Sequence, residues 1–303
     1  MLADEEAVNL RLRQMRLTRR QRAAILVGYA IQALRPVSPS AVKLAALNLH
    51  RPCVGDALCI ARLEGFRIIV SPRDYCGCVL YYHGIYEREQ TRIFERLIEQ
   101  LRPDTFLDIG ANLGYYSLTA AAQGVARVIS LEPSPEICEI FQASIALNPR
   151  LAPRIEPTQA AASDCDGEIA FWMNDSRENH GLGSIVGSAR GHAAPEIGVR
   201  GVRVDSLLDG KPLGKLLCKI DVEGAEQRVL DGMSRTIEKS RPTFLIEVHP
   251  RELSQQGQSA GGFVECLRDR SYQLHVLASG KEIPLGAEHC ETDANFCLVA
   301  RPR

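Results

Sequence analysis

The sequence predicts an α/β protein whose central sheet is mostly parallel and is covered by helices on both faces. Three observations support this fold class. A short apolar run at residues 106–109 ends in a glycine turn that leads into a helix starting near Tyr115. A second apolar run, at 127–131, follows that helix and ends in Glu132. Further apolar runs alternate with helical patterns through the central part of the chain, and this alternation is typical of parallel sheets packed between helices.

The remaining elements follow in order along the chain. Apolar runs predict strands over residues 155–162, 216–220, 243–246, 272–276 and 295–299, and residues 167–173 form an extra strand or a hairpin with 201–204. Apolar residues at helical spacing predict a helix that opens at 84–87 and ends near 101. We expect further helices over 135–147, which begins at Pro135 and is broken by Pro149, over 225–233 and over 262–270.

Residues 1–82 are predicted to be a helical and β-hairpin extension that precedes the main domain, residues 83–303. Residues 1–50 have a mostly helical pattern, and the strand-like runs at 57–70 are expected to turn at 63–66. The apolar run at 23–34 is too short to cross a bilayer. A basic cluster before it indicates either a weak membrane-surface or partner-docking helix or the solvated face of a helical cap, and we favour the cap. The cluster comprises Arg11, Arg13, Arg16, Arg19, Arg20 and Arg22.

Composition excludes some classes of function. The formal net charge of −1 gives no electrostatic footprint for nucleic acid. The ten cysteines are scattered, and most fall on apolar faces, which indicates a reducing, cytoplasmic compartment. The one close pair, Cys76 and Cys78, lacks the spacing of a zinc site.

The turn after the first core strand has the layout of a nucleoside-cofactor site. Gly110 and Gly114 permit a sharp turn and a close approach of the following helix to the strand or to a ligand. Glu132 lies about 20 residues further on, where an acidic residue accepts hydrogen bonds from a ribose diol. Asn112 stands where a dinucleotide fingerprint needs its second glycine, and Asp108 adds a negative charge. This charge repels a pyrophosphate and suits an ammonium group, which favours S-adenosylmethionine over NAD.

Two later segments are candidates for ligand contacts. Ser163 and Asp164 follow the predicted strand 155–162, and we expect them to touch the adenine edge, because ligands lie at the carboxyl ends of strands in such sheets. The polar segment 174–198 is long for a plain connection and is typical of a lid or binding loop. It contains Asn179, His180 and Ser184.

Acidic residues and a histidine follow the next two strands. Asp221 and Glu223 come after residues 216–220, and Glu247 and His249 end the strand after that. A carboxylate or imidazole near an attacking hydroxyl assists its loss of a proton. Asp221, Glu223 and His249 are therefore our candidate catalytic residues, although Asp221 and Glu223 also suit a helix N-terminus. A divalent metal on Asp221 and a neighbour stays open, but no compact ligand spacing requires one, and we expect none.

Several of these motifs resemble the FkbM-type family of methyltransferases. The resemblance runs from about residue 84 to 300 and rests on the segments Gly84-Ile85-Tyr86-Glu87, residues 107–117, Glu132-Pro133, residues 219–226 and Val229-Leu230-Asp231-Gly232. It implies a class I, Rossmann-like methyltransferase fold with S-adenosylmethionine as the donor and O-methylation of a hydroxyl on a sugar or natural-product-like small molecule. It also implies that Asp108, Gly110, Asn112 and Glu132 hold the donor, with Asp221 at its methyl end.

Two alternatives remain beside this one. An NAD-linked oxidoreductase is disfavoured by Asn112 and Asp108, as argued above. A catalytically inactive binding protein on the same fold is disfavoured by the intact glycine and acidic positions.

Overall fold

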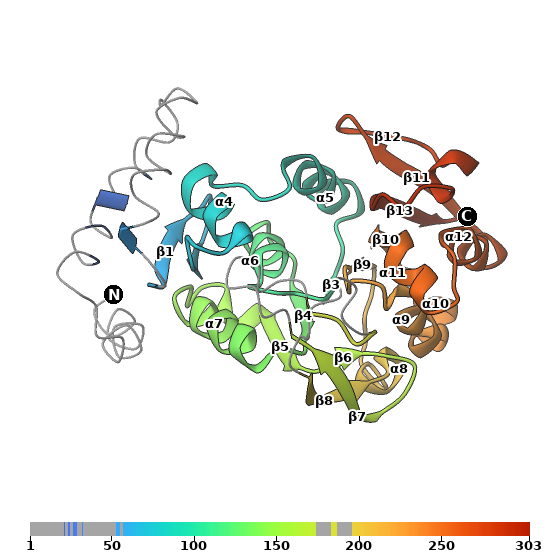
Figure 1. Ribbon diagram of the computed structural model, residues 1–303, viewed down its shortest axis with the longest axis horizontal. Helices are drawn as coiled ribbons and strands as arrows, with labels where there is room; N and C mark the ends of the chain where they lie inside the picture. Colours follow the sequence, from blue (N-terminus) through green and yellow to red (C-terminus); the bar gives the residue numbers. More distant parts are fainter. Residues whose placement is uncertain are drawn as a thin grey trace.

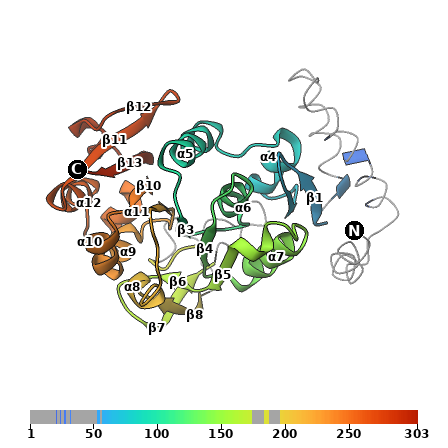
Figure 2. The ribbon, with the colours of Figure 1, turned by 180° about the vertical axis from the view of Figure 1, so that it is seen from behind.

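The computed structural model describes residues 57–173, 183–186 and 196–303, together with the single positions 21, 24, 27, 28, 32, 53 and 54. The basic cluster near the N-terminus and the loop residues Asn179 and His180 lie outside the described residues, so the predictions for them stay predictions. Figures 1 and 2 show the described part from opposite sides.

The central sheet has eight strands in the order β12-β11-β13-β10-β9-β3-β4-β5. The strands from β10 to β5 pair in parallel, and the three on the other side of β10 pair antiparallel. The predicted mostly parallel sheet is thus confirmed; β12, short and largely exposed, had no apolar pattern to predict it. The bounds are β3 (Thr105–Ile109), β4 (Arg127–Glu132), β5 (Ile155–Gln159), β9 (Leu216–Ile220), β10 (Thr243–Val248), β11 (Tyr272–Ala278), β12 (Lys281–Pro284) and β13 (Phe296–Pro302).

Helices cover both faces of this sheet, as predicted. Side chains alternate along a strand, and in β3 Phe106 packs into one hydrophobic cluster while Leu107 and Ile109 pack into another. The first cluster lies under α5 (Arg88–Leu101), α6 (Tyr115–Ala122) and α7 (Pro135–Ala146). The second lies under α8 (Val204–Leu207), α9 (Glu226–Gly232), α10 (Ser234–Ser240), α11 (Pro250–Gln255) and α12 (Ala260–Asp269). Figure 1 shows the two groups on opposite sides of the strands.

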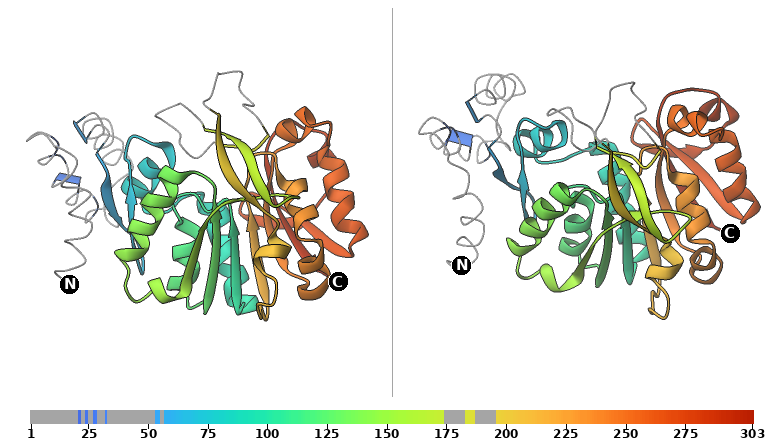
Figure 3. Two further views of the ribbon diagram at one scale, coloured as in Figure 1. Left: turned by 90° about the horizontal axis from the view of Figure 1, so that it is seen from below. Right: turned by 60° about the horizontal axis from the view of Figure 1, so that its bottom comes forward.

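A second sheet of three strands stands beside the first. It consists of β6 (Ala161–Ala162), β7 (Gly167–Trp172) and β8 (Glu196–Val202), in the order β6-β8-β7. The predicted hairpin is confirmed, since β7 and β8 pair antiparallel, and Figure 3 shows it beside the central strands. The single strand predicted at 155–162 is wrong in its second half. The central strand ends at Gln159, and Ala161 and Ala162 pair with β8 instead.

The described part of the N-terminal extension packs against the main domain. The predicted hairpin is present as β1 (Cys59–Arg62) and β2 (Arg67–Val70), and helix α4 (Tyr75–His83), which the sequence did not predict, follows it. The amide of Ile69 donates to Ser144 Oγ at 2.9 Å on α7. Leu80 and Phe106 belong to the same hydrophobic cluster. The hairpin and α4 therefore share a core with the central sheet.

Two further observations bear on the sequence predictions. None of the helices within the described ranges combines the length and apolar character that crossing a bilayer requires. Cys138, Cys218 and Cys297 are buried free thiols, as their positions on apolar faces predicted, whereas Cys266, predicted as a core residue on the same ground, is only partly buried.

Candidate active site

The glycine turn after β3 touches the acidic turn after β9. Gly110 has a φ of +80°, and a Cβ added there would overlap the carbonyl oxygen of Asp221. The amide of Asp221 in turn donates to the carbonyl of Ile109 at 3.0 Å. Glycine is needed at position 110 both for its left-handed backbone and for this close approach. The turn expected to hold a cofactor and the leading catalytic candidate are therefore joined backbone to backbone.

Glu132, at the end of the next strand, β4, holds the glycine turn through hydrogen bonds. Its Oε2 accepts from the amide of Asn112 and its Oε1 from the amide of Ser134, both at 2.9 Å. Burial raises the pKa of Glu132 to about 7, although these two amides oppose the shift. A carboxylate has about four lone-pair sites, so two backbone bonds leave capacity for a ribose diol. The geometry is compatible with the predicted role.

The rest of the glycine turn differs in part from expectation. Asn112 has a φ of +50°, a conformation that Asn tolerates better than most residues, and its Oδ1 accepts from the amide of Leu113 at 2.7 Å. Gly114 was expected to bring the helix close to the strand or a ligand. Instead, a Cβ added at Gly114 would overlap the ring of Phe141. The close approach that glycine permits here is to α7.

A cavity of about 260 Å³ opens over these turns. Glu132, Gly110 and Asn112 line one part of it, and Asp221, Glu223 and Lys219 line another. Small and apolar side chains form a further part of the wall; they include Leu113, Ile137, Ala160, Ala161, Ala162 and Phe171.

Asp108 does not line this cavity, contrary to expectation. It is 1% exposed, and its Oδ2 accepts from Ser117 Oγ on α6 at 2.6 Å. Burial raises its pKa, opposed by Lys219 and Ser117. Asp108 lies under the glycine turn and supports it from within. Its position does not favour the direct contact with an ammonium group that we had expected.

Ser163 and Asp164 are also misplaced in the sequence prediction. The chain leaves the central sheet at Gln159, so the residues that face the cavity are Ala160 and Ala161, ahead of Ser163. Ser163 is fully buried and its Oγ donates to Asp164 Oδ1 at 2.9 Å. Small side chains thus line this part of the cavity, where we had expected a polar pair.

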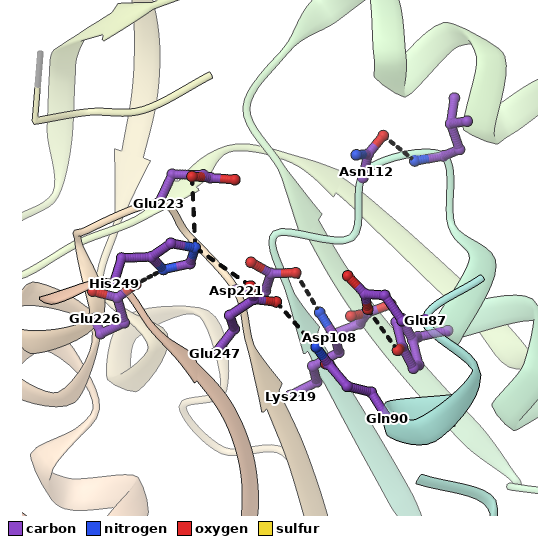
Figure 4. A network of polar contacts seen from close by, with 12 residues as sticks. Glu87, Gln90, Asp108, Asn112, Lys219, Asp221, Glu223, Glu226, Glu247 and His249 are labelled. Carbon is purple, nitrogen blue, oxygen red and sulfur yellow. Dashed lines mark hydrogen bonds and ion pairs between the residues drawn. The ribbon is translucent and has the colours of Figure 1, made fainter. Parts of the chain in front are cut away.

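Lys219 is a buried cation at the centre of the site that sequence reasoning passed over. Its Nζ lies 2.7 Å from Asp221 Oδ2 and 4.6 Å from the centre of the Tyr116 ring. Burial acts to lower the pKa of Lys219, but the Asp221, Glu87 and Asp108 carboxylates outweigh it and raise the pKa. Lys219 and His249 in turn hold the pKa of Asp221 below its usual range against the effect of burial. Both shifts favour the charged pair, and Figure 4 shows Lys219 pointing toward Asp221.

Glu87 is a second residue whose role the sequence did not predict. It precedes α5 with a φ of +41°, a strained conformation for Glu, and accepts from the Tyr116 hydroxyl at 2.9 Å. Burial raises its pKa to about 7, against the opposing charge of Lys219. A carboxylate that titrates near neutral pH is suited to exchanging protons. In the sequence, the family-like motif at residues 84–87 was the only feature that pointed to Glu87.

Glu87 also borders a second, more open cavity of about 550 Å³. Both cavities are lined by Glu87 and Asn295. The wall of the second comes from the start of α5, from β11 and from the segment before β13, and includes Arg88, Gln90, Leu277, His289 and Thr292.

His249 lies behind the cavity wall and is surrounded by carboxylates. Its Nδ1 is 2.6 Å from Glu226 Oε1, and its Nε2 is 3.5 Å from Glu223 Oε2 and 3.8 Å from Glu247 Oε1. Burial acts to lower the pKa of His249, but Glu226 outweighs it and raises the pKa to about 10. Burial raises the pKa of Glu223 to about 8. The structure thus brings Asp221, Glu223 and His249 together, as Figure 4 shows.

Ser184, from the long loop, reaches the same turn. Its Oγ donates to the carbonyl of Glu223 at 2.8 Å, and its backbone bridges to Trp172 of β7. Ser184 also lines the first cavity. The prediction that this loop contributes to the site is supported for the described residues Gly183–Val186 alone.

We expect Glu132→Ala to weaken binding of a ribose-bearing cofactor by about 1.5–3 kcal/mol, the range for hydrogen bonds to a charged group. Isothermal titration calorimetry with S-adenosylhomocysteine measures this directly. Glu136→Ala, an exposed substitution in the first turn of α7, is the matched control and should bind as the wild type does. Equal dissociation constants for Glu132→Ala and wild type would show that the ribose assignment is wrong.

A family of known proteins matches the central part of this chain. The family model described as "Methyltransferase FkbM domain" matches residues 108–274, more than half of the chain. Two curated relatives are each 24% identical to it. Hexuronic acid methyltransferase AglP of Haloferax volcanii aligns over 54% of this chain and 63% of its own length. AMB antimetabolite synthetase AmbE of Pseudomonas aeruginosa aligns over 67% of this chain and 11% of its own length. The chain therefore spans less than two thirds of either relative.

Among solved structures, the methyltransferase FkbM from Methylobacillus flagellatus KT is similar, with 16% identity and a TM-score of 0.42. The similarity covers 65% of this chain and 43% of that one. The family of this chain is assigned from the family match and not from this structural likeness.

Proposed function

Since the chain belongs to the FkbM methyltransferase family, we propose that it methylates a hydroxyl group on a sugar or natural-product-like small molecule. Its cofactor is S-adenosylmethionine. The observation that carries the proposal is the first cavity, which places Glu132 and the glycine turn beside the Asp221 turn. The relative AglP is named for a hexuronic acid, which supports a sugar-like acceptor.

The residues of the first cavity fit S-adenosylmethionine. Glu132 keeps free lone pairs for a ribose, and the small residues at 160–162 leave a slot for the base. Asp221, whose pKa is held low, puts a negative charge in the cavity wall that suits a sulfonium or an ammonium group. When bound, the cofactor supplies a methyl group attached to a positively charged sulfur atom. The sulfur keeps the electron pair of the carbon–sulfur bond when the methyl group is transferred.

The chain's own residues would orient the acceptor and receive its proton. Asp221 would accept a hydrogen bond from the attacking hydroxyl, so that an oxygen lone pair faces the methyl group at near-attack distance. Positive charge develops on that oxygen as the new bond forms, and the Asp221 carboxylate would stabilise it. Asp221 would take the hydroxyl proton along the same hydrogen bond. Glu87, a carboxylate with a pKa of about 7 at the junction of the two cavities, would receive that proton before it leaves to solvent. The second cavity would admit the rest of the acceptor.

Calorimetry followed by product analysis tests this function. We expect S-adenosylmethionine and S-adenosylhomocysteine to bind and NAD not to bind. With labelled donor and a panel of hydroxylated sugars and natural products, mass spectrometry should find the label as an O-methyl group. Binding of NAD alone would favour an oxidoreductase, and binding of none of the three would favour a binding protein that has lost activity. A label on nitrogen or carbon would contradict O-methylation.

A further inference from the structure

Three potential metal ligands converge at the wall of the first cavity. Asp221, Glu223 and His249 each offer one donor atom, and these atoms all lie within 4.8 Å of one another. They come from three different points: the residue after β9, the turn that follows it, and the residue between β10 and α11. Two donors on opposite sides of a divalent ion stand about 4.2 Å apart, so small side-chain adjustments would bring all three to bonding distance.

His249 is held in the way that proteins hold metal-binding histidines. It is 1% exposed, and the fully buried Glu226 accepts at its Nδ1 at 2.6 Å. Such a carboxylate fixes the tautomer and the ring orientation, so that the other nitrogen faces the ion. Here the other nitrogen, Nε2, faces the cluster. Among the described residues no hydrogen bond reaches Nε2, and its nearest carboxylate oxygens stand at 3.5 and 3.8 Å.

The spacing around Nε2 points to a shared cation. A direct hydrogen bond between a charged nitrogen and a carboxylate is normally about 2.7–2.9 Å long, so both carboxylates stand back from the ring. On Asp221, Lys219 occupies only Oδ2, and Oδ1 remains as a donor atom. Glu247 is, after Glu223, the second carboxylate beside the same nitrogen.

We propose that Asp221, Glu223 and His249 bind a divalent transition-metal ion, with Glu226 as the positioning residue behind His249. One imidazole with two carboxylates suits Mn²⁺, Fe²⁺ or Zn²⁺ better than Mg²⁺, which prefers oxygen ligands alone. Since Asp221 and Glu223 line the cavity, the ion would lie in its wall. A role in holding the acceptor hydroxyl rests on the proposed function, but binding of the ion does not.

Titration of the full chain with Mn²⁺ tests this proposal without an acceptor. After treatment with EDTA and desalting, the loss of the free Mn²⁺ signal in electron paramagnetic resonance should reveal a single saturable site. Glu223→Gln should weaken the site at least about tenfold, and Glu226→Gln about 10- to 100-fold, the range for residues that orient a ligand. Glu168→Gln, on β7 and away from the cavity, should bind Mn²⁺ as the wild type does.

The outcomes separate this proposal from its alternatives. Circular dichroism and S-adenosylhomocysteine binding establish that each variant is folded. Glu223→Gln is the first variant to test, because Glu223 is 22% exposed and its substitution disturbs the fold less than that of the buried His249. His249→Gln is the second ligand variant. Lack of Mn²⁺ binding by the wild type would overturn the proposal and leave a protonated His249 as the cation of the cluster. Equal Mn²⁺ affinity in Glu223→Gln and wild type would overturn it as well. Mn²⁺ binding without S-adenosylhomocysteine binding would contradict the proposed function alone.

Discussion

Asp221→Asn should lower turnover by about 10²- to 10⁴-fold, the range for a group that assists proton transfer in the transition state. The amide keeps the size of the side chain but loses the charge that would stabilise the attacking oxygen. Donor affinity should change much less, because Glu132 and the glycine turn would hold the ribose. Single-turnover kinetics at saturating S-adenosylmethionine, with calorimetry of S-adenosylhomocysteine, separates the two effects.

The matched control for this substitution is Asp231→Asn on the exposed side of α9, outside both cavities. It should keep the wild-type turnover. Full activity in Asp221→Asn would remove Asp221 from the mechanism. A loss of donor affinity as large as the loss of turnover would assign Asp221 to the donor rather than to the acceptor.

Lys219→Met should destabilise the fold by about 3–5 kcal/mol, the cost of removing one partner of a buried ion pair. Lys219 is 2% exposed, and its removal leaves Asp221 and Asp108 without the charge that opposes their burial. Equilibrium unfolding in urea, followed by circular dichroism, measures the change. The loss should be smaller at low pH, where the carboxylates become protonated.

Lys211→Met is the control for this experiment. The Lys211 side chain is one-third exposed and its Nζ lies 3.8 Å from Glu156, so its loss should cost about 1 kcal/mol or less. Equal effects of the two substitutions would show that Lys219 is not the charge that balances the site.

The sequence predicted the parts of the site that depend on local pattern. The run from Thr105 through the glycine turn to Tyr115, and the strand that ends in Glu132, lie where apolar periodicity and glycine placed them. These signals are strong because a buried parallel strand must be apolar throughout and a sharp turn needs a left-handed residue.

Contacts between distant segments could not be predicted in the same way. Asp108 was expected in the cavity, but α6 covers it through Ser117, nine residues later. Ser163 was expected at the adenine edge, but pairing with β8 takes the chain off the central sheet after Gln159. Lys219 looked like an ordinary strand residue, and only packing against Tyr116 and Asp221 makes it the central cation.

The proposed use of the first cavity for the donor and of the second for the acceptor has a consequence for engineering. The donor side is made of backbone turns locked to each other at Gly110 and Asp221, so alterations there would disturb both. The wall of the second cavity comes from β11 and the segment before β13, at the C-terminal end of the chain. Exchanging these wall segments between relatives should therefore change which acceptor is preferred and leave binding of the donor unchanged.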